Sequence, residues 1–150
     1  MGLTDADMSK AKYVFAAIFS LSNRWQTLGD RIDSTISLKQ WFVLAIIANS
    51  TSKTNNLGDI AKSYGTSRQN IKKIAIILEK KGFLSLKKDP NDKRSLQLTL
   101  TEKCYEYLKS RHQQEALYFM SVFSDVDKEI IETLYEGTKK LIENTDKIMD

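Results

Sequence analysis

The segment TSRQNIKK, residues 66–73, brings hydroxyl, amide and cationic side chains together within about two helical turns. Amide side chains can pair with adenine edges through two hydrogen bonds, hydroxyls adapt to several bases, and lysines bond phosphate or guanine. Such groups are suited to the major groove of DNA. The candidate DNA-contacting residues of this segment are Thr66, Ser67, Arg68, Gln69, Asn70, Lys72 and Lys73.

A helix across this segment would have one apolar face and one polar face. The apolar residues follow the i, i+3, i+4, i+7 spacing of a buried helix face, at Ile71, Ile74, Ala75 and Leu78. We call the opposite side the polar arc, which consists of Gln69, Lys73 and Lys80, flanked by Thr66, Asn70 and Lys72. An ordinary solvated face would also be polar, but the lack of an acid on the arc before Glu79 favours a polyanion. Ile76 falls on the same side, where it contacts either a thymine methyl group or a neighbouring element.

The segment KKDPNDKR, residues 87–94, predicts a tight turn with cations at its tip. Asp89 followed by Pro90 suits a type I turn. Leucines alternate with polar residues on both sides, as in a hairpin whose apolar face packs on helices, at Leu84, Leu86, Leu96, Leu98 and Leu100. An arginine on a rigid turn can enter a narrow minor groove. The candidate DNA-contacting residues of this hairpin, the wing, are Lys87, Lys88, Asp92, Lys93 and Arg94. We predict that Asp92 orients the Arg94 guanidinium by a charge-assisted hydrogen bond.

The elements that must position these residues are mostly helical. Apolar periodicity and capping signals predict six helices. The first three span residues 5–30, residue 37 to the start of the polar segment 49–56, and residues 57–64. The last three span residue 66 or 67 to residue 82, residues 101–123, and residues from about 124 to 148. Ser37 with Gln40 forms a capping-box pattern, and Gly65 permits a sharp turn between two helices. The expected fold is mainly α with a small two-stranded wing.

Charge is distributed unevenly along the 150 residues. Residues 51–100 hold 11 basic and 4 acidic side chains, a net charge of +7, whereas residues 1–50 carry +1 and residues 101–150 carry −4. A basic centre between a neutral and an acidic flank indicates that the middle third meets a polyanion. The alternative is a merely solvated basic surface.

Several classes of protein are excluded by what the sequence lacks. A single cysteine rules out an internal disulfide, and one histidine with one cysteine makes no typical zinc site, so we expect no metal. No glycine-rich phosphate loop or Ser/His/Asp set is visible, and we expect no catalytic residue and no cofactor. The apolar run at residues 13–21 is taken as helix rather than signal peptide, and no run is long enough to span a bilayer. We expect a cytoplasmic protein.

Three stretches carry a resemblance to a known family: ISLKQWFVLAII, LGDIAKSYGTSRQNIKKIAIILEKKGFL and DPNDKRSLQLTLTEK. The chain resembles the MarR family of winged-helix transcriptional regulators over nearly its whole length. The resemblance implies a winged helix-turn-helix lobe at residues 37–100, a helical dimerisation region at residues 1–36 and 101–150, and binding of palindromic operators in double-stranded DNA by a homodimer. Two positions depart from the family pattern: Leu86 replaces a frequent basic residue, and Cys104 replaces a common glycine.

The resemblance also implies a small aromatic or anionic effector, bound between the dimer helices and the DNA lobe. Candidate lining residues are Tyr13, Phe15, Trp25, Trp41 and His112, although aromatic residues at helical spacing also occur as plain core and a lone histidine on an apolar stripe also occurs as a core or interface residue. Cys104 could act in redox sensing, since Lys103 and a helix N-terminus can lower a thiol pKa. Peroxide-sensing members keep their cysteine in the first helix, so we expect a structural thiol here.

The sequence therefore predicts a homodimeric, sequence-specific DNA-binding regulator, a repressor that a small-molecule effector releases. The apolar stripes of the first, fifth and sixth predicted helices support the dimer, because they are more extensive than a monomer of 150 residues can hide. The alternative is a winged-helix protein-interaction module without operator binding. Such a module would lack the basic arc or the cations of the wing.

Overall fold

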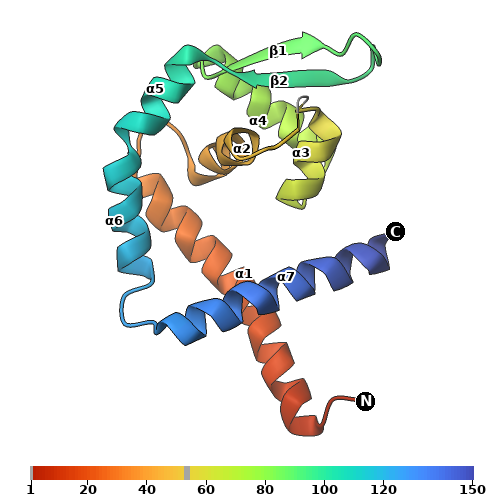
Figure 1. Ribbon diagram of the computed structural model, residues 1–150, viewed down its shortest axis with the longest axis vertical. Coiled ribbons are helices and arrows are strands. Elements are labelled where there is room, and N and C mark those ends of the chain that lie inside the picture. Colours follow the sequence, from red (N-terminus) through yellow and green to blue (C-terminus); the bar gives the residue numbers. More distant parts are fainter. Residues whose placement is uncertain (1, 53–54) are drawn as a thin grey trace. The chain divides into compact units, whose positions relative to one another are not determined.

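The computed structural model describes residues 2–52 and 55–150, which form two compact units divided between Glu106 and Tyr107. The order of elements is α1 (Asp5–Ile32), α2 (Leu38–Ala48), α3 (Leu57–Tyr64), α4 (Arg68–Lys80), β1 (Leu84–Lys88), β2 (Leu96–Leu100), α5 (Glu102–Ser110), α6 (His112–Val122) and α7 (Lys128–Met149) (Figure 1). The predicted fold class, mainly α with one two-stranded antiparallel sheet, is confirmed. The predicted loop at residues 49–56 includes residues 53 and 54, which lie outside the described residues.

Side-chain caps fix where the helices of the first unit begin. Thr4 and Ser37 each accept a hydrogen bond from the third residue of the helix that follows, whose own side chain bonds back to the cap. The capping box predicted from Ser37 and Gln40 is therefore confirmed. α1 and α2 are held together at the same place, because the Leu38 N–H donates to the Asp30 carboxylate at 2.6 Å. Gly29 packs beside Leu38 so closely that an added Cβ would lie 2.9 Å from its Cδ1.

The core of the first unit forms between α2, α3, α4 and the sheet. Its fully buried side chains come from each of these elements and are Val43, Leu44, Ile60, Ile71, Leu78 and Leu98. The predicted inner face of α4 is confirmed for Ile71, Ala75 and Leu78, while Ile74 is half-buried. Each such side chain contributes about 1.5–3 kcal/mol when it leaves water, so α4 is held by this face.

The prediction of one helix across residues 101–123 was wrong. The structure has two helices there, with a break at Arg111, and the described residues form seven helices rather than six. The Ser110 hydroxyl donates to the Tyr107 carbonyl at 2.7 Å, a local bond that competes with regular helix geometry. The Arg111 N–H still reaches the same carbonyl at 3.2 Å, so the interruption is a single turn.

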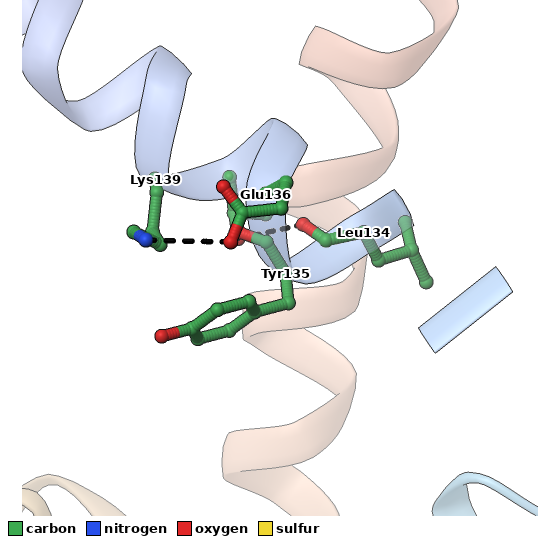
Figure 2. Close-up of polar contacts among 5 residues, drawn as sticks. Leu134, Tyr135, Glu136 and Lys139 are labelled. Atoms are coloured by element: carbon green, nitrogen blue, oxygen red, sulfur yellow. Dashed lines mark hydrogen bonds and ion pairs between the residues drawn. The ribbon is translucent and has the colours of Figure 1, made fainter. Parts of the chain in front are cut away.

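The second unit contains α6 and α7, and neither helix buries a residue within this chain. Figure 2 shows part of α7, where Lys139 pairs with Glu136 at 3.3 Å and lies over the Tyr135 ring. The Thr138 hydroxyl donates to the carbonyls of Leu134 and Tyr135. α7 begins after Asp127, close to the predicted start at residue 124. A search of the described helices for one long and apolar enough to cross a bilayer finds none.

Candidate nucleic-acid interface

A glycine turn sets the angle between α3 and α4. Gly65 has a left-handed backbone, with φ of 77°, and its N–H donates to the Ala61 carbonyl at 2.9 Å. Thr66 donates to the same carbonyl at 3.0 Å. An L side chain at residue 65 would strain this conformation, so glycine ends α3 and lets α4 start at once. The predicted helix-turn-helix is confirmed in this geometry.

The first turn of α4 is ordered by its own polar side chains. Ser67 caps the helix by accepting from the Asn70 N–H, and the Asn70 amide donates to the Thr66 hydroxyl at 3.1 Å. The Arg68 side chain lies against Gly58 of α3, where an added Cβ would come within 3.1 Å of its Nε and Nη2 atoms. Sequence reasoning missed this last contact, because it joins residues of different helices.

The outer side of α4 leaves the polar arc available to a partner. Gln69, Lys72, Lys73 and Lys80 are all exposed. Within residues 2–52 and 55–150, the side chains of these residues form no hydrogen bond or ion pair. Their hydrogen-bond donors are therefore free for a ligand, and three of the four are cations. Such a strip suits phosphates and base edges.

One edge of the wing is held on α4 and the other on the segment that precedes α3. Its two strands form the predicted antiparallel hairpin, and Leu86 lies opposite Leu98. On the β1 edge, the Leu86 N–H donates to the Glu79 carboxylate of α4 at 3.1 Å. On the β2 edge, the Leu98 N–H donates to the Asn55 carbonyl at 2.8 Å. The wing therefore extends from the C-terminal end of α4 as a fixed part of the lobe (Figure 1), and the acid of α4 is used in holding it.

The wing tip is shaped by two aspartates that bond to nearby backbone. Asp89 accepts from the Asn91 N–H at 2.8 Å, and Asp92 accepts from the Arg94 N–H at 2.9 Å. We predicted that Asp92 would bond the Arg94 guanidinium, whereas its carboxylate orders the Arg94 backbone instead. A carboxylate that accepts from the backbone N–H two residues later closes a compact turn. A bond to the end of the long arginine side chain would not close the backbone in this way. The cations that this turn carries are exposed, and they are Lys87, Lys88, Lys93 and Arg94.

Two lysines near the end of α4 hold the lobe together. Lys81 donates to the Thr35 carbonyl at 2.6 Å and to Gln40 at 3.1 Å, which ties α4 to the segment between α1 and α2. Lys103 donates to the Lys81 carbonyl at 2.7 Å and lies over the Phe83 ring. Both cations are engaged in structure, and Lys81 is one of the basic residues of the middle third, so the positive charge of that segment is not all available to a ligand.

The predicted effector-lining residues are distributed over both units. Tyr13, Phe15 and Trp25 are exposed on α1, and Trp41 is half-buried on α2. His112 is exposed at the first position of α6, next to the break that divides the predicted helix. The pocket stays a prediction.

Cys104 is a buried thiol. Its side chain is 0% exposed, and its N–H donates to the Thr101 hydroxyl that begins α5. Burial raises the pKa of the Cys104 thiol from 9.0 to about 11, so the thiolate is scarce at neutral pH. Lys103 could have lowered this pKa, but its ammonium group bonds the Lys81 carbonyl. The redox role considered from the sequence has no support in this environment.

Cys104 is therefore expected to resist alkylation in the folded protein. At pH 8, iodoacetamide should modify it at least about 100-fold more slowly than in 6 M guanidinium, since the raised pKa alone removes most of the thiolate. The Cys104 thiol has a higher pKa in the folded state than in the unfolded state, so its deprotonation favours unfolding. The free energy of unfolding should therefore fall as pH rises from 9 to 11. Mass spectrometry of quenched samples measures the rate. Equal rates in both states would contradict this assignment.

The comparisons with known proteins agree with this geometry. Residues 36–96 match the model of the MarR family. The transcriptional repressor MprA of Escherichia coli (strain K12) is 28% identical over 116 residues, covering 74% of this chain and 64% of that protein, so the match spans less than two thirds of the relative. The transcriptional activatory protein BadR of Rhodopseudomonas palustris is 26% identical over 156 residues, covering 97% of this chain and 86% of that protein.

A solved structure extends the likeness in fold to most of the chain. Sco3205, a MarR family transcriptional regulator from Streptomyces coelicolor crystallised in complex with DNA, matches with a TM-score of 0.77 at 21% identity, covering 96% of this chain and 90% of that one. The helix-turn-helix and the wing give this chain a winged-helix fold, and its residues 36–96 are similar to the MarR family of transcriptional regulators.

Proposed function

We propose that this protein is a homodimeric transcriptional regulator that binds double-stranded DNA in a sequence-specific way. The observation that carries the proposal is the free polar arc of α4 together with the exposed cations of the wing, on one lobe. α4 would enter the major groove, and Arg94 would enter the adjacent minor groove. The similarity of residues 36–96 to the MarR family supports this function over catalysis.

The residues of α4 would divide between bases and backbone. Gln69, Asn70 and Thr66 would contact base edges, although the bond between Asn70 and Thr66 has to open or be shared for both to do so. Ser67, whose oxygen accepts the capping bond, keeps its O–H to donate to a phosphate. Arg68, Lys72 and Lys73 would bind phosphates, and Lys73 could also reach guanine.

Unburied apolar faces support the homodimer. Large side chains of α1, α6 and α7 remain exposed in the single chain, among them Tyr13, Phe15, Leu117, Met120, Leu134, Leu141 and Ile148. Faces of this extent mark interaction sites in soluble proteins. Thr138 lies near this face on α7 with its hydroxyl already bonded to its own helix, so burying it leaves no donor unpaired. Two lobes about 34–36 Å apart would meet successive major grooves of a palindromic operator.

Effector control is the less constrained part of the proposal. A small aromatic or anionic molecule bound near Tyr13, Phe15, Trp25, Trp41 and His112 would act by favouring one separation of the lobes over another. The outcome would be release of a repressor. The printed names of the relatives include both a repressor and an activatory protein, so a reporter gene is needed to decide the direction. We expect the protein to act in the cytoplasm, where its DNA is.

A salt series on a gel shift tests the proposed function. The purified protein should retard fragments that flank its own gene, and its affinity should fall about a thousandfold between about 50 and 200 mM salt if about six phosphates are contacted. Lys72→Gln should reduce the slope of log affinity against log salt concentration by about one, because one phosphate contact is lost. Lys147→Gln on α7 should leave that slope unchanged. A flat series, or no retarded fragment from the whole genome, would favour the protein-interaction module instead.

A further inference from the structure

Ile76 lies on the DNA-facing side of α4, although it is apolar. It is 38% exposed, whereas Ile71, Ala75 and Leu78 of the same helix are buried. At about 100° per residue, Ile76 is turned roughly 130° away from that buried face. Its direction falls between those of Lys72 and Gln69, which are both exposed. The core of the lobe therefore leaves much of this side chain open.

Cations occupy three of the four neighbouring positions around this exposed isoleucine on the helix. The neighbours at i−4, i−3 and i+4 are Lys72, Lys73 and Lys80, and the one at i+3 is Glu79. Glu79, the nearest acid on the helix, accepts a hydrogen bond from the Leu86 N–H of the wing. A β-branched residue also forms helix less well than lysine or glutamate, so helix stability does not favour isoleucine here. A partner for this patch must be a polyanion that offers a small apolar contact.

The major groove of DNA meets both requirements. Its base edges carry one apolar group, the C5 methyl of thymine, surrounded by phosphates. We propose that Ile76 contacts a thymine methyl and is a specificity-determining residue of operator recognition. This inference rests on the proposed function and adds a base preference to it.

The helix also predicts where that thymine lies. Gln69 precedes Ile76 by seven residues, about 10.5 Å along the helix, and points in nearly the same direction. That rise corresponds to about three base-pair steps. Gln69 is suited to adenine, so each half-site should hold an adenine contacted by Gln69 and a thymine about three steps from it.

Replacing thymine by deoxyuridine tests the contact, because it removes the methyl group and nothing else. A duplex selected by the wild-type protein is remade with each thymine replaced singly, and affinities are measured by fluorescence anisotropy. The affinity of the wild-type protein should fall roughly fourfold when deoxyuridine replaces the thymine at one position in each half-site, which is the effect of one buried methyl group. Ile76→Ala should bind the thymine and deoxyuridine duplexes equally at that position, and Ile76→Val should keep part of the difference.

Ile77 supplies a positional control on the same helix. It is 43% exposed and lies about 100° from Ile76 around the helix axis, on the other flank of the polar arc between Thr66 and Asn70. Ile77→Ala should keep the wild-type discrimination at the thymine that Ile76→Ala no longer distinguishes, and circular dichroism melts should show each variant folded. If wild type discriminates at no thymine, or Ile76→Ala discriminates as wild type does, the inference is overturned while DNA binding still stands. If wild type selects no duplex at all, the proposed function fails and the inference fails with it.

Discussion

Arg94→Ala is expected to weaken operator binding about ten- to a hundredfold at fixed moderate salt. The side chain is exposed at the wing tip, and Asp92 orders the Arg94 backbone, so binding costs little further backbone entropy at this residue. A hydrogen bond to a charged group contributes about 1.5–3 kcal/mol, which sets the size of the loss. Fluorescence anisotropy with a labelled operator measures it.

Two further variants separate charge from shape at this position. Arg94→Lys keeps the positive charge but loses the planar fork, so its affinity should lie between those of wild type and Arg94→Ala. Asp92→Ala loses the bond to the Arg94 N–H and should weaken binding less than Arg94→Ala. Thermal unfolding should change little in all three, because these residues are exposed. Wild-type affinity for Arg94→Ala would remove the wing from the interface.

Leu134→Glu is expected to convert the proposed dimer to monomers and to reduce operator affinity at least about a hundredfold. Leu134 is 51% exposed on α7, and its spacing of seven residues from Leu141 and of fourteen from Ile148 places all three on the same helical face. A carboxylate placed in an apolar interface is costly, and loss of the second lobe removes the effective concentration that links two half-sites. Analytical ultracentrifugation measures the mass, and a gel shift measures the affinity.

Glu136 gives the control on the same helix. It points away from the apolar face and pairs with the exposed Lys139, so Glu136→Gln should leave both the mass and the affinity unchanged. Surface pairs of this kind contribute little to stability. A monomeric wild-type protein, or a Leu134→Glu variant that sediments as a dimer, would contradict the proposed assembly.

Features that follow from local rules could be predicted from the sequence. The Ser37 cap, the Gly65 turn and the buried face of α4 each depend on a few neighbouring residues and on helix periodicity, and the structure confirms them. The leucine alternation also predicted the two strands of the wing, although the pairing of residues across them came only from the structure. Each of these signals is strong because several residues agree on one backbone conformation.

Contacts between distant residues could not be predicted in this way. The Glu79 carboxylate that holds Leu86 and the Asn55 carbonyl that holds Leu98 depend on how the lobe folds, not on spacing along the chain. The break at Arg111 has no glycine or proline to mark it, and the Ser110 hydroxyl that accompanies it is a weak signal. In the candidate site, the residue types were visible beforehand, but the roles of Asp92 and of Lys81 in holding backbone were not.

Footprinting of the bound operator tests the central claim most directly, namely that one lobe uses both grooves. Dimethyl sulfate protection reports major-groove guanines, and hydroxyl radicals report the backbone across the minor groove. We predict two protected major-groove segments about one helical turn apart, each beside a minor-groove protection that disappears in Arg94→Ala. Major-groove guanines that stay reactive in the saturated complex, or a minor-groove pattern that Arg94→Ala leaves intact, would contradict the account.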